Sequence, residues 1–269
     1  MRLAQISDFH FTRPTWNPLR LCSKRLVGQM NWLFARKHKF GEPQLHALPQ
    51  LLKQLQVDRV LLGGDFTSTA LPSEFQVAQH FVKKLHCPWT AVPGNHDVYT
   101  LGSQWTNRYQ RYFGDCPSVQ KLDDVWTLIT LNTARPSWSS KGHFSEHDER
   151  ALEQMLQSVG PTQKIILLNH YSFLNNDRPT RSLMRANALE DIVSKDKRIK
   201  LYLHGHTHRH TVADLQRGGL PIVLDGGCSA DVRRGSWNLI TLGNTCRVDV
   251  YKWTNRWNLE RTDEIAWQR

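Results

Sequence analysis

The chain has 269 residues, of which 39% are hydrophobic and 22% are charged, a composition that excludes a disordered chain. Its length suits a single domain over residues 1–269 with a substantial core. Lysine and arginine outnumber aspartate and glutamate by 35 to 24. The resulting net charge of +11 predicts an anionic partner, such as nucleic acid, a phosphorylated metabolite or an acidic membrane face.

The sequence predicts neither a membrane-spanning helix nor a secretory leader. No run of about 18 apolar residues is present, and the first residues lead directly into a strand pattern. The cysteines are scattered, odd in number and lack a C-x-x-C pair, which is typical of a reducing compartment and disfavours thiolate metal ligands. They are Cys22, Cys87, Cys116, Cys228 and Cys246. We therefore expect a cytoplasmic protein.

Strand and helix patterns alternate early in the chain, and strands dominate its last part. Apolar runs predict strands at 2–7, 57–62, 88–92, 125–131, 164–168, 199–203, 220–224, 237–241 and 247–253. Helical spacing of apolar side chains predicts helices at 44–56, 73–85, 103–113, 145–158 and 181–194. Pro49 favours a kink or a late start in the first of these helices. Ser145 gives the fourth a capping-box-like start.

An insertion at about residues 12–43 separates the first strand from the helix at 44–56. Its apolar residues recur every three or four positions, as one face of a helix requires; they are Leu26, Val27, Met30, Leu33 and Phe34. Basic residues flank this stripe and Trp32 lies within it, a composition typical of a helix in a membrane interface. The alternative is an ordinary amphipathic helix that packs on the core.

Five of the predicted strands end in a turn rich in histidine, aspartate or asparagine. The turns are Asp8-Phe9-His10, Gly63-Gly64-Asp65, Gly94-Asn95-His96-Asp97, Asn169-His170 and Gly205-His206-Thr207-His208. Because open α/β sheets place ligands at the carboxyl ends of their strands, we expect the turns to converge. Carboxylate, amide and imidazole groups suit manganese, iron or zinc. A shared carboxylate can hold two such ions for phosphoester hydrolysis.

The order of the motifs, D-x-H, G-D, G-N-H-D, H and G-H-x-H, resembles that of the calcineurin-like metallophosphoesterase superfamily from residue 3 to about 230. The resemblance implies an α/β fold, a four-layer α-β-β-α sandwich of two mixed sheets. It also implies a phosphohydrolase that uses two divalent metal ions, with Mn²⁺ expected first and iron or zinc as alternatives.

The same resemblance implies roles for individual residues. The first metal would be held by Asp8, His10, Asp65 and His208, and the second by Asp65, Asn95, His170 and His206, with Asp65 bridging. His96 would stabilise the transition state or protonate the leaving oxygen, and Asp97 would orient its imidazole ring. From their places after strand ends, Arg135 and Arg178 are candidates for contact with substrate phosphate. His204 and His210 fall outside the motif, so we expect surface or supporting roles for them.

The superfamily motifs imply the reaction but not the substrate. Within the insertion, residues 22–28 and 31–34 resemble the insertion of chlamydial-type UDP-2,3-diacylglucosamine pyrophosphatases. That second resemblance implies a lipid-linked nucleotide substrate in lipid A synthesis, cleaved to UMP and a diacylglucosamine phosphate by an enzyme peripheral to the inner membrane.

Three alternatives remain. A cyclic-nucleotide (cAMP-type) or other phosphodiesterase has the same metal motifs and does not need the insertion. A nuclease would use the basic charge, but the absence of an identifiable stacking platform disfavours a nucleic-acid partner. A non-catalytic scaffold is disfavoured because every motif position is filled.

Overall fold

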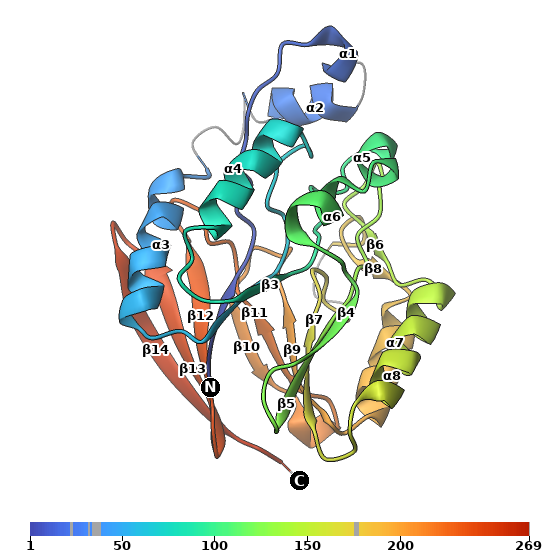
Figure 1. Cartoon of the computed structure of the whole chain (residues 1–269), viewed down its shortest axis with the longest axis vertical. Coiled ribbons are helices and arrows are strands. Elements are labelled where there is room, and N and C mark those ends of the chain that lie inside the picture. Colours follow the sequence, from blue (N-terminus) through green and yellow to red (C-terminus); the bar gives the residue numbers. More distant parts are fainter. Residues whose placement is uncertain (22–23, 32, 34–38, 175–177, 269) are drawn as a thin grey trace.

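The computed structural model describes residues 1–21, 24–31, 33, 39–174 and 178–268 (Figure 1). Two six-stranded sheets form its centre. The order of the first sheet is β14 (Trp257–Ala266), β13 (Thr245–Trp253), β12 (Ser236–Leu242), β1 (Arg2–Ile6), β2 (Arg59–Leu62), β3 (Trp89–Ala91). The strands β1, β2 and β3 are parallel, whereas β12, β13 and β14 pair antiparallel. The first sheet is therefore mixed.

The second sheet is also mixed. Its order is β10 (Thr211–Asp214), β11 (Ile222–Asp225), β9 (Ile199–His204), β7 (Lys164–Leu168), β5 (Trp126–Thr130), β4 (Ser118–Lys121). The four central strands are parallel and the two edge strands are antiparallel to their neighbours. A two-stranded pair, β6 (Gly142–His143) and β8 (Leu183–Met184), lies apart from both.

Eight α-helices and a short 3-10 helix, Gln216–Gly218, lie in the described part of the chain. The α-helices are α1 (Pro18–Leu21), α2 (Lys24–Asn31), α3 (Glu42–Gln54), α4 (Pro72–Val82), α5 (Leu101–Trp105), α6 (Arg108–Phe113), α7 (Glu146–Ser158) and α8 (Ala186–Lys195). None of these helices is both long and apolar enough to cross a bilayer. In Figure 1, α3 and α4 lie on the opposite side of the sheets from α7 and α8.

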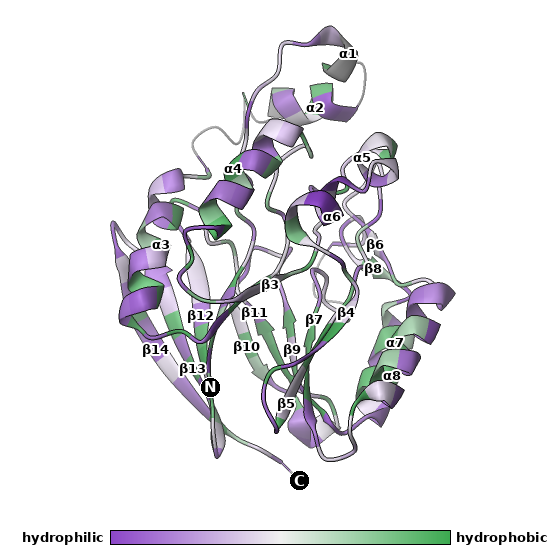
Figure 2. Cartoon of the chain, viewed as in Figure 1, coloured by the Kyte–Doolittle hydropathy of each residue, from purple (hydrophilic) through white to green (hydrophobic). Residues whose placement is uncertain are grey.

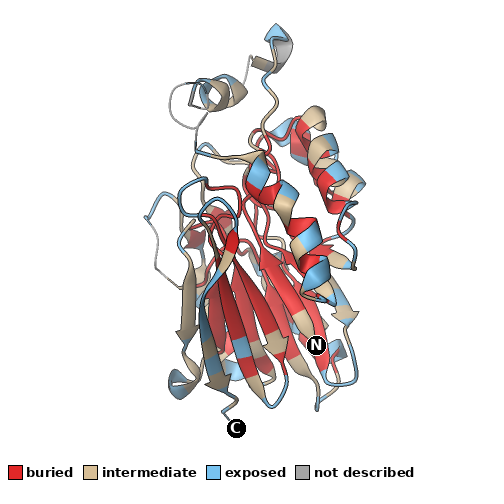
Figure 3. Cartoon of the chain, turned by 90° about the vertical axis from the view of Figure 1, so that its left-hand side faces the viewer, coloured by how far each residue is buried: buried red, intermediate tan, exposed pale blue. Residues whose placement is uncertain are grey.

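Alternating side chains of the second sheet divide the core into two clusters. On β7, Ile166 and Leu168 join the larger cluster, which contains the first sheet and the buried faces of α3 and α4. Ile165 and Leu167 point the other way and join the cluster with α7 and α8, because successive strand residues face opposite sides of a sheet. The central strands are green in Figure 2 and red in Figure 3, as strands covered on both faces should be. The predicted four-layer α-β-β-α sandwich is confirmed.

The main strands follow the predictions, and the differences have local causes. All nine predicted strands are present, whereas β4, β6, β8, β10 and β14 were not predicted. The helix expected at 103–113 is two helices, because Asn107 has a left-handed backbone (φ 45°). The helix expected at 181–194 begins at Ala186, after β8. Helix α3 starts at Glu42 and continues through Pro49, and Ser145 and Asp148 form a capping box.

The helix predicted within the insertion is only partly described. Helix α2 covers Lys24–Asn31, and the predicted stripe residue Phe34 lies outside the described residues, as does Trp32. Figure 1 shows α1 and α2 at one end of the molecule, beyond α4 and α5. Figure 3 shows this segment in tan and pale blue, without the red of buried residues. Helices α1 and α2 therefore lie outside the four layers.

Candidate dinuclear metal centre

The five predicted turns converge at one edge of the sandwich. They follow β1, β2 and β3 of the first sheet and β7 and β9 of the second. Parallel neighbours end at the same edge, so turns distant in sequence become adjacent in space. The strand-end pattern thus brings one set of side chains together, as expected from the general rule for α/β sheets: Asp8, His10, Asp65, His170, His206 and His208.

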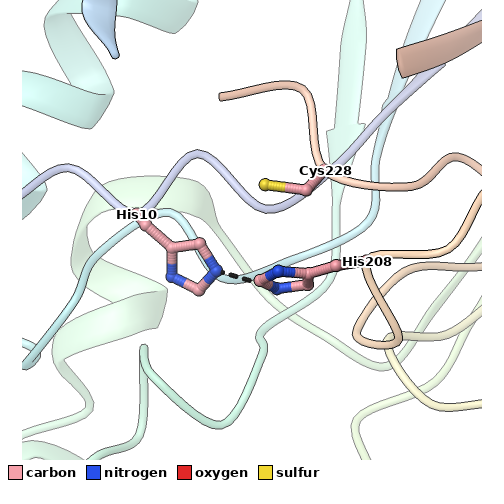
Figure 4. A group of neighbouring side chains, drawn as sticks. All are labelled: His10, His208 and Cys228. Atoms are coloured by element: carbon pink, nitrogen blue, oxygen red, sulfur yellow. Dashed lines mark hydrogen bonds between the residues drawn. The ribbon is translucent and has the colours of Figure 1, made fainter. Parts of the chain in front are cut away.

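One group of polar side chains gathers around His10 and His208. The Nε2 atoms of these two rings are 3.1 Å apart (Figure 4). Asp8 Oδ1 is 3.1 Å from His208 Nε2 and 3.7 Å from His10 Nε2. A carboxylate oxygen and two imidazole nitrogens at these separations could hold one cation among them.

A second group gathers around Asp65. Its Oδ2 atom is 3.6 Å from His170 Nε2 and 4.0 Å from His10 Nε2, and His206 Nδ1 is 3.2 Å from His170 Nε2. Asp65 therefore belongs both to a cluster with His170 and His206 and to a cluster with His10 and His96, in each of which the potential ligand atoms lie within 4.8 Å of one another. A carboxylate in that position can serve two cations.

Two buried oxygen atoms at this edge fit bound cations. Asp8 Oδ1 and Asn95 Oδ1 are buried and accept no hydrogen bond from the described residues. Buried oxygens normally have a hydrogen-bond donor, so two unsatisfied oxygens fit an electrophile that the described residues do not supply. The donor set of carboxylate, amide oxygen and imidazole suits a borderline divalent metal.

The backbone at the centre is strained. Five of the seven predicted ligands have positive φ angles, an uncommon conformation for residues other than glycine. They are Asp8 (61°), His10 (50°), Asp65 (56°), His206 (71°) and His208 (58°). Such conformations cost free energy and persist where the surrounding structure imposes them, often at functional sites.

Two glycines allow the turns to approach one another closely. A Cβ atom at Gly94 would lie 2.1 Å from Asp65 Oδ1, and one at Gly205 would lie 2.0 Å from Ser7 Oγ. Neither position has room for a side chain. The glycines that precede Asn95 and His206 are thus required by packing between turns.

Electrostatic coupling makes Asp65 and His170 an ion pair. Burial alone would raise the pKa of Asp65, but the positive charge of His170 holds it well below its usual range. Burial alone would lower the pKa of His170, but the Asp65 carboxylate raises it to about 9. Burial and the charge of His170 lower the pKa of His206, which keeps that ring neutral. His206 is therefore in the protonation state that a metal ligand needs, whereas His170 must first lose a proton.

His96 lies beside both groups and is held at two points. Its backbone N–H donates to Asp65 Oδ1 at 2.8 Å, and its ring Nδ1 lies 2.6 Å from the carbonyl oxygen of Ser68. Because a carbonyl oxygen only accepts, Nδ1 carries a proton. The ring also stacks on Tyr99, with centroids 5.6 Å apart. These contacts fix the ring without using Nε2.

The predicted role of Asp97 stays a prediction. The Asp97 carboxylate accepts hydrogen bonds from the backbone N–H groups of Phe66, Thr67 and Gly94, while Ser68 orients the imidazole of His96. Burial and the charge of Asp65 raise the pKa of Asp97 to about 7. Successive residues of the turn point in different directions, so Asp97 ties two turns together and does not contact the His96 ring through these bonds.

The predicted phosphate contact of Arg135 stays a prediction. Its guanidinium donates to Asp148 Oδ2 at 2.6 Å and to the carbonyl oxygens of Asn132 and Ala134. Arg178 is exposed and directly follows residues outside the described part. The arginine that reaches the centre is Arg181, which donates to the His206 carbonyl oxygen and whose own carbonyl lies 2.9 Å from His206 Nε2.

Cys228 was not expected at the centre, because the scattered cysteines gave no ligand pattern. It groups with His10 and His208 (Figure 4). Its thiol donates to the Asp8 carbonyl oxygen at 3.2 Å, and burial raises its pKa well above the usual value. Cys228 follows β11, whose carboxyl end lies at the same edge of the sandwich. Its position after a predicted strand is the sequence feature that could have indicated its place at the centre.

Asp225 and His204 are buried next to the turn that carries His206 and His208. Asp225 accepts from Thr207 Oγ1 at 2.5 Å and from the Gly227 N–H at 2.7 Å, so it fixes the turn between His206 and His208. His204 is buried beside it, and burial lowers the pKa of His204 to about 4. His204 is therefore a neutral interior residue.

The sandwich of two mixed sheets and the Asp/His clusters at its edge define the class of protein as a metal-dependent hydrolase. The sequence model of the calcineurin-like phosphoesterases matches residues 1–210. The chain therefore belongs to the calcineurin-like phosphoesterase family, and it is a metal-dependent phosphohydrolase.

Individual relatives are distant. The chain is 25% identical over 233 residues to a probable cyclic nucleotide phosphodiesterase of Synechococcus sp., covering 86% of this chain and 80% of the relative. It is 24% identical over 172 residues to a glycerophosphodiester phosphodiesterase of Enterobacter lignolyticus, covering 63% and 56%. A dimetal phosphatase from Danio rerio has the same fold, with a TM-score of 0.63, 11% identity and 99% of both chains covered.

Proposed function

We propose that the centre binds two divalent cations and hydrolyses a phosphodiester or phosphoanhydride bond of a small molecule. Asp8, His10, Asp65 and His208 would hold one cation, and Asp65, Asn95, His170 and His206 the other. The observation that carries this proposal is the shared position of Asp65 between two clusters of ligand atoms. Mn²⁺ is the first candidate and iron or zinc the alternatives, because the donor set suits all three.

The cations, Asp65 and His96 would have different roles in the proposed reaction. Cations bound at the centre supply Lewis acidity to the phosphoryl oxygens and make water acidic near neutral pH. Asp65 neutralises the excess positive charge and fixes the turn of His96 through its bond to the His96 N–H. Because Nδ1 of His96 donates to the Ser68 carbonyl oxygen, the proton for the leaving oxygen would come from Nε2 of the doubly protonated ring, which then becomes the neutral Nδ1–H imidazole.

The first candidate substrate is a lipid-linked nucleotide of the UDP-2,3-diacylglucosamine type, cleaved by an enzyme peripheral to a membrane. Large apolar side chains are exposed on α2, on α5 and in nearby loops: Trp16, Leu26, Val27, Met30, Leu33, Leu101, Trp105 and Trp138. The apolar stripe of α2 thus faces outward, and Val27 alone is 63% exposed. Tryptophan and aliphatic residues next to basic ones favour contact with acyl chains and anionic lipid.

The second candidate is a cyclic nucleotide or a glycerophosphodiester. Relatives named for these two activities match this chain at 24–25% identity. Such substrates need the cation centre and His96 but no apolar surface. Their support comes from the relatives, whereas that of the lipid-linked substrate comes from the insertion.

An assay that compares the candidates decides between them. Mn²⁺-dependent hydrolysis of UDP-2,3-diacylglucosamine in detergent micelles is expected to release UMP, with cyclic AMP and a glycerophosphodiester cleaved more slowly at equal concentration. Turnover of cyclic AMP or the glycerophosphodiester alone would reject the lipid-linked substrate and leave the metal centre intact. No hydrolysis of any of them with Mn²⁺, Fe²⁺ or Zn²⁺ would reject the proposed function.

Metal uptake is expected to release protons and to strengthen as the pH rises towards 9. Below its pKa of about 9, His170 in the metal-free protein is protonated, and a cation must displace that proton to bind the ring. One displaced proton raises the apparent affinity about tenfold per pH unit. Calorimetric titration of Mn²⁺ in buffers of different ionisation enthalpy measures this release. Uptake without proton release near neutral pH would argue against His170 as a ligand.

A further inference from the structure

A cavity of about 560 Å³ opens between α2, the start of α5 and the loop that follows β5. That volume is in the range of small-molecule binding sites. Its lining is mainly apolar and includes Tyr99, Leu101, Pro136 and Trp138, with Lys24 as the charged residue. Cavities of this composition bind a largely apolar ligand that is oriented by a few polar groups.

The cavity adjoins the metal centre through Tyr99. The Tyr99 ring stacks on His96, and the ammonium of Lys24 lies 4.4 Å from the centroid of the same ring. Lys24 is also close enough to Asp65 for the Asp65 carboxylate to support its charge, although burial lowers the Lys24 pKa more strongly. Lys24 therefore lies between the groups of potential metal ligands and the apolar lining of the cavity.

The Lys24 ammonium is half-buried and available to an anion. It donates to the Ser137 carbonyl oxygen at 2.5 Å, and it makes no ion pair within 4.0 Å with a carboxylate of the described residues. An ammonium group has three donors. A partly dehydrated ammonium with no carboxylate in direct contact binds an incoming anion more strongly than a surface lysine does.

Helix α2 is held so that Lys24 keeps this position. Arg25 Nε donates to the Thr69 carbonyl oxygen at 2.9 Å, and its Nη2 donates to Thr100 Oγ1 at 3.2 Å. Gly28 packs so closely that a Cβ atom there would lie 2.6 Å from the Tyr99 hydroxyl. The inward face of α2 is thus fixed to the loops that carry the catalytic site.

We propose that this cavity is a substrate subsite for a second, non-reacting phosphate that carries an apolar substituent. Lys24 binds that phosphate while the neighbouring phosphorus reacts at the metal centre, and Leu101, Pro136 and Trp138 contact the apolar substituent. The subsite deepens the proposed function and rests on it, since it presumes that phosphate chemistry occurs beside His96. It selects diphosphates with an apolar group over compact phosphodiesters.

The subsite is tested by inhibition of bis(p-nitrophenyl) phosphate hydrolysis by the metal-loaded enzyme. The inhibitors are inorganic phosphate, methyl diphosphate and decyl diphosphate. In Lys24→Met, the inhibition constants of both diphosphates should rise at least about tenfold more than that of inorganic phosphate, as expected for one lost charge-assisted hydrogen bond. In Trp138→Ala, only decyl diphosphate should weaken. Lys83→Met, which removes an exposed lysine of α4's C-terminal end, is the control.

Three results would overturn the subsite. Unchanged inhibition by decyl diphosphate in Lys24→Met would remove the phosphate contact. An equal loss for inorganic phosphate would place Lys24 at the metal centre itself, and equal inhibition by the methyl and decyl compounds in the unaltered enzyme would remove the apolar contact. Direct calorimetric binding of decyl diphosphate tests the subsite even if the lipid-nucleotide assay fails, so the two proposals can fail separately.

Discussion

Replacing Asp65 with asparagine is expected to remove both metal ions and nearly all activity. An amide offers one neutral oxygen, so it can neither bridge two cations nor neutralise them. The loss of metal affinity and activity should exceed the roughly 10- to 100-fold loss that is typical when a residue hydrogen-bonded to a metal ligand is replaced. Elemental analysis of metal content and the rate of bis(p-nitrophenyl) phosphate hydrolysis measure the two effects.

The same substitution should also change the metal-free protein. Without the Asp65 carboxylate, the pKa of His170 should fall from about 9, because burial lowers it and its strongest opposing charge is gone. NMR titration of the His170 ring reports this directly. Asp249→Asn is the matched control, because Asp249 accepts hydrogen bonds from Thr262 and Arg247 on the first sheet, outside the clusters. Two full metal equivalents in Asp65→Asn would contradict the bridging role.

Replacing His96 with asparagine should preserve the metal content and reduce kcat by about 10²- to 10⁴-fold, the usual contribution of a general acid. The side chain of His96 lies beside the proposed ligands, and its backbone bond to Asp65 does not depend on the ring. Proton delivery to the leaving oxygen would be lost, whereas the electrostatic contribution of the cations would remain.

The loss of rate on replacing His96 should depend on the leaving group of the substrate. If Nε2 of His96 protonates the leaving oxygen, the substitution should slow esters with alkyl leaving groups far more than nitrophenyl esters, because nitrophenolate leaves without a proton. An exposed histidine of α4, His80, provides the control variant His80→Ala. Equal losses for both kinds of ester would assign His96 to charge stabilisation and not to proton transfer.

The insertion supplies the surface on which the proposed lipid-linked substrate depends. Its described residues place exposed apolar side chains and Lys24 beside the proposed metal centre. The proposed subsite is therefore built from residues other than the proposed metal ligands.

The sequence alone determined the four-layer fold and the convergence of the five turns. Each motif directly follows a buried strand, and parallel strands of a sheet end at one edge, so the turns after β1, β2 and β3 lie together and so do those after β7 and β9. The order and chemistry of the motifs also sufficed to identify the family. These predictions succeed because strand periodicity and turn residues depend on only a few neighbouring positions, which the sequence shows directly.

Only the tertiary structure decided where individual side chains point. Helical periodicity shows that α2 has an apolar face, but it cannot say that Arg25 and Gly28 face the protein while Val27 faces outward. Likewise, Arg135 follows a strand end and Arg181 begins a predicted helix, but long-range partners decide their contacts, Asp148 for the first and His206 for the second. Partners of this kind come from distant segments, so their positions are fixed by packing and not by local sequence.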